Sequence, residues 1–393
     1  LDVFAYDLGE PYVASALLTL AGQKRVRVIL DDAALHRSTD GKTTSEDAFA
    51  KAFARLDKAS IKRGHFGRYA HDKVLIVSDR KTEGSGGARK VLTGSTNFSI
   101  TGLYVNSNHV VVYDDPKVAG TYAEVFEAAW KGDVKTAAFL KTPLSQKPFD
   151  FGGRGVPDTT ITFSPHKPEV ADGILGGLVE RVEAEGKKKA GNVLFAVMEL
   201  GAGSSSTVYK ALNALHKEQN IFSFGISDNP DGISLYKPGV KRGLLVTGTP
   251  ASTRLPPPFD QVPSVKSAGA GHQVHHKFVV CGFRSDDAVV YCGSSNLANK
   301  GETVNGDNLL AIRDTDVATA FAIEAIGLVD HFNFLNRYRS EAKTNTGKTP
   351  KAAPVSLKEA AVEAGWHLQT GDSWVASYYD PDDMHYADRE LFG

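Results

Sequence analysis

The chain has 393 residues, which at roughly 100–200 residues per domain allows two to four domains and a substantial core. Hydrophobic residues make up 41% and charged residues 23%, values typical of a globular protein, so the composition excludes a disordered or fibrous chain. The formal net charge of -1 excludes a chain-wide positive field that would hold nucleic acid unspecifically. With only two cysteines, a disulfide framework and a zinc site of four thiolates are also excluded.

In chain order, the first predicted elements are a strand over 2–6, a helix over 11–20 and a strand over 25–30. The chain starts at Leu1, not Met, and enters a strand directly, as a processed form or a fragment would. No run approaches the roughly 18 consecutive apolar residues that a membrane span needs. The sequence does not fix the location of the protein in or outside the cell.

Two blocks of the sequence repeat the same chemical groups in the same order. Five motif positions of the first block are matched by five of the second: His71, Lys73, Ser95, Asn97 and Asn108, then His275, Lys277, Ser294, Asn296 and Asp307. The histidines and lysines differ by 204 positions, and the remaining pairs by 199. Such constant offsets indicate an internal duplication with five extra residues between the lysine and the serine of the first copy.

Each block predicts a β-hairpin with turn residues between two apolar runs. If His71 faces Asn97 and Lys73 faces Ser95, paired residue numbers sum to 168, and the same pairing in the second copy gives 571. The bends then fall on turn residues in both copies. Because side chains alternate along a strand, the His, Lys, Ser and Asn of each copy are expected on one face.

The second copy repeats the strand, helix and strand of the amino end over 193–198, 206–215 and 221–226. A helix is expected after each asparagine-rich block, over 118–130 and 317–336. Strands alternating with helices predict an α/β fold whose sheets are covered on their faces. The second copy also has an earlier strand and helix, at 160–164 and 167–185, which the first copy lacks, so we expect the chain to begin inside its first repeat.

These patterns divide the chain into four parts. Residues 1–142 are the first repeat, 143–159 a linker rich in proline and glycine, 160–342 the second repeat, and 343–393 a tail expected to pack on the body.

The repeated residue types suit a tetrahedral phosphate. Near neutral pH histidine acts as a nucleophile or general acid, lysine supplies a positive charge, and serine and asparagine supply neutral donors. Displacement at phosphorus needs attack on one side and protonation of the leaving oxygen on the other. A pair of histidines, one from each copy, provides both groups.

The double H-x-K and G-S-x-N pattern resembles the phospholipase D superfamily over both halves. The resemblance implies a pseudo-twofold pair of α/β/α lobes, a covalent phosphohistidine, and neither a metal nor another cofactor. It also implies that the repeated histidines, lysines, serines and asparagines line one site. The chain departs from the family seven residues after each histidine, where Ser78 and Gly282 replace an aspartate that is usually structural.

A second acidic position of the family differs between the copies, with Asn108 in the first and Asp307 in the second. A carboxylate stabilises an imidazole that gains charge, whereas an amide holds the proton of an acid less tightly. The tyrosyl-DNA phosphodiesterase branch has a similar split. By that resemblance, Asp307 supports His71 as the nucleophile and Asn108 contacts His275 as the general acid.

The expected activity is hydrolysis of a phospholipid headgroup ester, or its transfer to another alcohol, by a monomer in transient contact with lipid. A nuclease of the same superfamily is the first alternative, disfavoured by the balanced charge, and an inactive binding protein of the same fold is the second. The spacing of histidines 272, 275 and 276 disfavours a metal cluster. The segments 65–69 and 254–259 are either rims of the site or plain surface loops.

Overall fold

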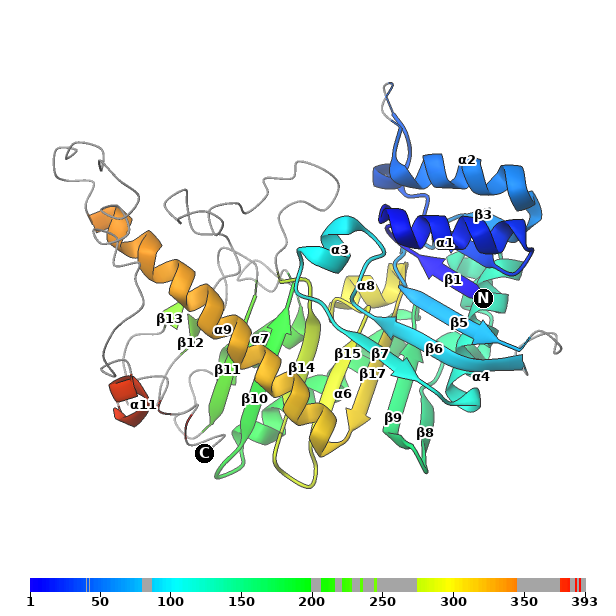
Figure 1. The fold of residues 1–393 in the computed structure, drawn as a ribbon. Coiled ribbons are helices and arrows are strands. Elements are labelled where there is room, and N and C mark those ends of the chain that lie inside the picture. The colour runs from blue at the N-terminus through cyan, green and yellow to red at the C-terminus, as the bar shows by residue number, and fades with distance from the viewer. Residues whose placement is uncertain are drawn as a thin grey trace, which may run out of the picture.

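A computed structural model describes most of the chain (Figure 1). It describes residues 1–344, except 40, 42, 80–86, 199–205, 216–220, 228–233, 236–243 and 246–273, and then residues 375–381, 386 and 389. The loop at 254–259 and most of the predicted tail therefore lie outside the described residues. Among the helices of the described part, none is long and apolar enough to cross a membrane.

The first repeat forms a mixed sheet of six strands within the described residues. In spatial order these are β3 (Ile61–Arg63), β2 (Arg27–Leu30), β1 (Asp2–Ala5), β5 (Val74–Ser78), β6 (Ala88–Gly94) and β7 (Val110–Tyr113). β1, β2 and β3 run parallel, and β5 joins β1 antiparallel.

Helices cover both faces of this sheet, because successive side chains of each strand point to opposite faces and both sets are apolar. Val3 and Val28 point to one face, where they pack with α1 (Pro11–Gly22) and α2 (Ser45–Asp57). Phe4 and Ile29 point to the other, into the larger core that contains α4 (Pro116–Lys131). Figure 1 shows α1 and α2 side by side above the sheet.

The second repeat forms a sheet of seven strands within the described residues. Their spatial order is β11 (Phe222–Ile226), β10 (Asn192–Val197), β14 (Lys277–Cys281), β15 (Val289–Gly293), β17 (Asn308–Arg313), β9 (Val156–Phe163) and β8 (Phe149–Gly153). Its central strands are mostly apolar, and all of β14 is buried, as expected for a strand covered on both faces.

Three helices pack on the second sheet or on one another. α9 (Thr315–Thr344) contacts five of its strands and crosses one face in Figure 1, while α6 (Pro168–Gly186) contacts β10, β14 and α7 (Thr207–Leu215).

Equivalent aspartates begin the helices that follow the motifs. Asp115 accepts hydrogen bonds from the first turn of α4, and Asp314 accepts one from Val317 in the first turn of α9.

The two sheets repeat one topology, which confirms the predicted α/β class. The order β2-β1-β5-β6-β7 in the first sheet is matched by β11-β10-β14-β15-β17 in the second. β9 pairs with β17 at the position where the first sheet ends in β7.

The segment 143–159 differs from the plain linker predicted for it. It contains the short helix η4 (Pro143–Ser145), the strand β8 and the start of the strand β9. The two strands are paired into the second sheet. The sequence missed these strands because glycine and proline flank them on both sides.

The predicted hairpins exist, but their register was wrong by one residue. Leu75 faces Leu92 in the first and Val279 faces Tyr291 in the second, so paired numbers sum to 167 and 570. Cys281 and Cys292 are both buried and free.

Two short parallel pairings join the lobes and deliver the motif histidines. β4 (Tyr69–Ala70) pairs with β16 (Asn305–Gly306), and Ser107 pairs with Val274 in the equivalent place of the other copy. Each histidine follows one member of a pair, and the acidic or amide residue follows the other. The seam therefore brings His71 beside Asp307 and His275 beside Asn108.

Candidate active site

The glycine that opens each G-S-x-N motif fixes where the serine lies. Gly94 and Gly293 have φ angles of 145° and 138°, in the region that favours glycine. A Cβ on Gly94 would lie 2.3 Å from the carbonyl oxygen of His109, and one on Gly293 would lie 2.4 Å from that of Asn308. The motif needs glycine because the chain turns sharply against a neighbouring strand.

His71 is held by the acidic residue of the other repeat. Its Nδ1–H donates to Oδ1 of Asp307 at 2.6 Å, so Nε2 is the free ring nitrogen. Burial lowers the pKa of His71 to about 4, although the charge of Asp307 opposes this shift. At neutral pH the imidazole is therefore uncharged, the form that can act as a nucleophile.

His275 has an amide in the equivalent position. Its Nδ1–H donates to Oδ1 of Asn108 at 2.7 Å, and Nδ2 of Asn108 donates to the carbonyl oxygen of Gly102, which fixes the amide orientation. The contacts expected from the resemblance are both present. At equivalent positions, one histidine thus bonds to a carboxylate and the other to an amide.

The two lysines lie fully buried behind the histidines. Lys73 donates to the carbonyl oxygen of His71, and Lys277 donates to that of His275 at 2.8 Å. Lys73 also lies 4.6 Å from the ring centroid of Tyr6. Burial lowers the pKa of Lys73 to about 8, against the opposing charges of Asp307 and Asp72.

The two serines do not point their hydroxyls into the pocket. Ser95 donates to Asn108 at 2.8 Å, and Ser294 accepts from the backbone N–H of Asn308 at 3.0 Å. Ser95 thus holds Asn108, the partner of His275, and Ser294 holds Asn308, which follows Asp307, the partner of His71. This geometry does not favour a role of the serines as direct phosphate donors. The sequence could not tell whether each serine donates to the phosphate or holds other site residues, because either role uses the same motif position.

A pocket of about 300 Å³ opens between the repeats. Of the ten predicted site residues, His71, Asn97, His275 and Asn296 line it. Both asparagines have a buried Oδ1 that bonds to nothing among the described residues, so they retain unused hydrogen-bonding capacity.

Other pocket residues were not predicted from the sequence. Tyr6, Asp7 and His36 line the wall on the side of the first repeat, and Met198 lies on the side of the second. Arg68 and Tyr69, from the segment considered as a rim, also line it. Tyr6 packs edge-on against His71 with ring centroids 4.6 Å apart.

The middle residues of the H-x-K motifs pair across the seam instead of facing the pocket. Asp72 accepts from Nδ2 of Asn308 at 2.7 Å, while in the other copy His276 lies 3.3 Å from His109, Nδ1 to Nδ1. Nε2 of His276 bonds to Glu324, whereas His275 bonds to Asn108. The two neighbouring histidines thus have different partners. His272 lies outside the described residues.

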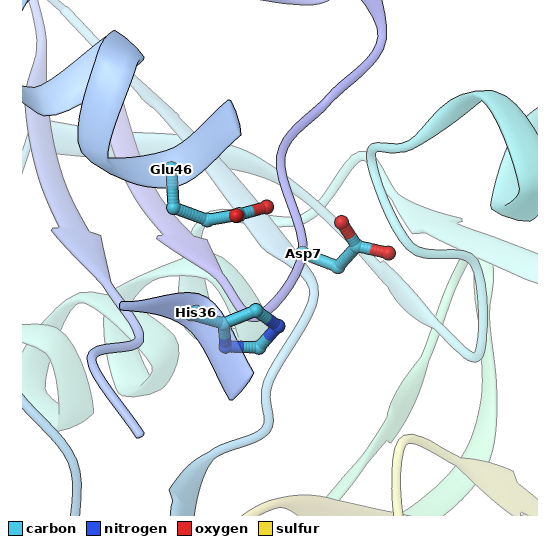
Figure 2. A group of neighbouring side chains, drawn as sticks. All are labelled: Asp7, His36 and Glu46. Atoms are coloured by element: carbon cyan, nitrogen blue, oxygen red, sulfur yellow. The ribbon is translucent and has the colours of Figure 1, made fainter. Parts of the chain in front are cut away.

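A separate group of side chains beside the pocket has the chemistry of a metal ligand set. Ligand atoms of Asp7, His36 and Glu46 all lie within 4.8 Å of one another. Figure 2 shows the three side chains approaching from different segments of the first repeat.

A family model matches the part of the chain that carries the first copy of the motif. Residues 1–130 match the family model described as "Cardiolipin synthase, PLD-like domain". A search of curated proteins finds no match.

Two solved structures illustrate the structural likeness. The chain resembles polyphosphate kinase from Porphyromonas gingivalis at 13% identity and a TM-score of 0.48, over 80% of this chain and 43% of the kinase. It resembles Nuc, a phospholipase D family member from Salmonella typhimurium, at 25% identity and a TM-score of 0.25, over 33% of this chain and 76% of Nuc. The chain thus spans less than half the length of the kinase.

Proposed function

Because the chain belongs to the phospholipase D superfamily, we propose that it hydrolyses a phospholipid headgroup ester through a phosphohistidine. The main support is the pair of buried histidines in one pocket, one bonded to a carboxylate and one to an amide. This asymmetry suits one nucleophile and one acid.

In the proposed mechanism, Nε2 of His71 attacks phosphorus and the bond to the leaving oxygen breaks. Nε2–H of His275 donates its proton to that oxygen, so the alcohol leaves neutral. His71 becomes cationic as its bond to phosphorus forms, and the nearby carboxylate of Asp307 stabilises this charge.

The second step reverses these roles. His275, now neutral, takes a proton from water, and the oxygen of that water attacks phosphorus as the bond to His71 breaks. An alcohol in place of water would give transfer of the phosphatidyl group. Lys73 and Lys277 lie close behind the histidines and would stabilise the negative charge of the phosphoryl group.

Two observations support a lipid substrate. The matching family model bears the name of cardiolipin synthase, an enzyme named for a phospholipid. The net charge of -1 provides no overall attraction for the backbone of a nucleic acid.

One panel of assays tests the substrate class. Release of choline from phosphatidylcholine and cleavage of single- and double-stranded DNA are measured with the wild-type protein and with His71→Ala, each with EDTA. We expect choline release that survives EDTA and is lost in H71A. DNA cleavage without choline release would favour the nuclease instead, and complete loss of activity in EDTA would contradict metal-free chemistry.

A further inference from the structure

The group formed by Asp7, His36 and Glu46 lies in the wall of the pocket but takes no part in the proposed reaction. Asp7 follows β1, His36 ends the short helix η1 (Ala34–His36), and Glu46 lies in the first turn of α2. His36 and Glu46 are 1% and 3% exposed, and Asp7 and His36 both line the pocket. The group is therefore buried yet reachable from the pocket.

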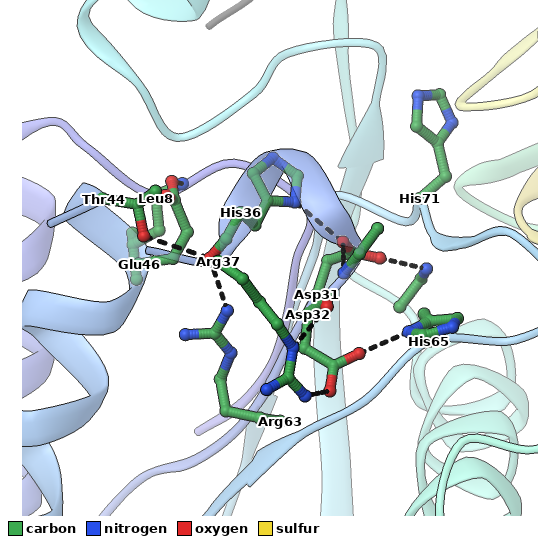
Figure 3. Close-up of polar contacts among 12 residues, drawn as sticks. Leu8, Asp31, Asp32, His36, Arg37, Thr44, Glu46, Arg63, His65 and His71 are labelled. Atoms are coloured by element: carbon green, nitrogen blue, oxygen red, sulfur yellow. Dashed lines mark hydrogen bonds and ion pairs between the residues drawn. The ribbon is translucent and has the colours of Figure 1, made fainter. Parts of the chain in front are cut away.

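His36 is oriented as a metal-binding histidine usually is. Its Nδ1–H donates to Asp31 at 2.7 Å, and Asp31 also accepts from the backbone N–H groups of Ala33 and Ala70 (Figure 3). A carboxylate held this way fixes the ring and leaves the Nε2 lone pair of the neutral imidazole for a ligand. In the part of the chain that the structure describes, Nε2 of His36 makes no hydrogen bond.

The two carboxylates lack a basic partner. Arg63 bonds to Asp47, and Arg37 and His65 both bond to Asp32, so the nearby basic side chains are used elsewhere. Among the described residues, neither Asp7 nor Glu46 forms an ion pair with a lysine or arginine. Buried carboxylates are normally paired or bound to a metal.

The carboxylate oxygens of Asp7 and Glu46 lie within 4.8 Å of each other. The backbone N–H of Leu8 and the hydroxyl of Ser45, which donate to Glu46, are neutral groups. A divalent cation between the two carboxylates would remove their repulsion.

We propose that Asp7, His36 and Glu46 bind a divalent transition-metal ion, with its remaining coordination positions open to the pocket. One imidazole nitrogen and two carboxylate oxygens suit Zn²⁺ or Mn²⁺ better than Ca²⁺ or Mg²⁺, which prefer oxygen ligands alone. The sequence predicts no metal here because the three ligands come from three separate segments with no motif spacing.

This site is distinct from the reacting histidines. The ring of Tyr6 packs against both His36 and His71, with centroid distances of 4.6 Å to each, so it lies between the two sites. The proposal therefore does not alter the metal-free chemistry of His71 and His275.

Direct metal binding tests the proposal without any substrate. The whole chain is stripped with EDTA, and binding of Zn²⁺ and Mn²⁺ is measured by calorimetry and by elemental analysis after gel filtration. We expect one strong site in the wild-type protein, lost in His36→Gln and in Asp7→Asn. His331→Gln changes an exposed histidine of α9 and should bind as the wild type does.

Asp31→Asn provides a graded test, because a carboxylate that orients a metal-binding histidine usually contributes 10- to 100-fold to affinity. We expect weakening of about that size. Circular dichroism establishes whether each variant is folded. If H36Q does not fold, D7N alone tests the proposal. Absence of a strong site in the wild-type protein, or unchanged binding in both folded variants, would overturn the proposal. Because no phosphodiester is present, the result is independent of the proposed function.

Discussion

The two motif histidines bond to different functional groups at equivalent positions. Asp307 accepts from His71 and Asn108 accepts from His275 at nearly equal distances, 2.6 and 2.7 Å. Because the geometry is so similar, exchanging amide and carboxylate should change the chemistry of each histidine more than its position.

We expect Asp307→Asn and Asn108→Asp to slow different parts of the first step. D307N removes the charge that stabilises cationic His71, so the rate should fall roughly 100-fold for any leaving group. N108D makes His275 hold its proton more tightly, so the loss should be large for an alkyl alcohol and small for p-nitrophenol, which leaves without protonation.

Turnover of phosphodiesters with these two leaving groups measures the difference. An equal loss for both leaving groups in N108D, with a leaving-group dependence in D307N, would reverse the assigned roles. Trapped phosphoenzyme should then also be found on His275 rather than on His71.

The buried state of His71 predicts the pH dependence of the reaction. Attack needs the neutral ring, and burial lowers the pKa of His71 to about 4. The acid limb of kcat/KM should therefore lie near pH 4, well below the value of about 6.5 for an exposed histidine. A pH–rate profile measures this, with circular dichroism at each pH as the control for folding.

Variants at the two contacts sharpen the same experiment. The charge of Asp307 raises the pKa of His71, so D307N should move the acid limb to still lower pH. N108D adds its charge next to His275 rather than next to His71, so it should move the limb only slightly, and toward higher pH. An acid limb near pH 6.5 in the wild-type protein would contradict a neutral, buried nucleophile.

At the scale of elements, the glycine that ends β15 is tightly constrained by the neighbouring strand. Gly293→Ala should destabilise the protein by about 2 kcal/mol or more, because φ is 138° and the new Cβ would lie 2.4 Å from the carbonyl oxygen of Asn308. Gly173→Ala in α6 is the matched control, since a Cβ added there would meet no neighbouring group within 4 Å. That change should stabilise by about 0.5 kcal/mol.

Thermal unfolding followed by circular dichroism compares the two variants under identical conditions. G293A should melt several degrees lower than the wild type and G173A slightly higher. If G293A melts at the wild-type temperature, the sharp turn does not depend on the glycine.

The hairpins show what the sequence can and cannot predict for an element. The apolar runs with turn residues between them predicted both hairpins, and the structure contains both pairs of strands. The turn of the first hairpin, at 80–86, lies outside the described residues. The register was wrong because it assumed that His71 and Lys73 lie within the paired strand. β5 begins only at Val74, so both residues precede the ladder and the alternation of faces does not extend to them.

At the scale of the whole molecule, the repeat predicted two similar lobes that share one site, and the topology agrees. The seam itself was not predictable in detail. The pairs Asp72–Asn308 and His109–His276 occupy equivalent places but use different residue types. The internal repeat of the sequence therefore does not reveal them. The group of Asp7, His36 and Glu46 likewise exists only once the first repeat has folded.

The seam contains a carboxyl group that opposes folding at neutral pH. Burial raises the pKa of Asp72 to about 7, and the charge of Asp307 adds to the shift. Between about pH 4 and pH 7 the unfolded chain releases this proton while the folded chain keeps it, so the free energy of unfolding falls as pH rises.

Asp72→Asn should therefore stabilise the protein at alkaline pH and leave it nearly unchanged in acid. The amide keeps an acceptor for Nδ2 of Asn308 but carries no charge, so the gain at pH 8 should be on the order of 2 kcal/mol and vanish near pH 4. Melting temperatures of D72N and wild type across this range measure the effect, and Glu183→Gln, at an exposed carboxylate, is the control. A lower melting temperature for D72N at pH 8 would mean that the seam requires an ionised Asp72, and the two lobes would then be joined by a charge rather than by neutral hydrogen bonds.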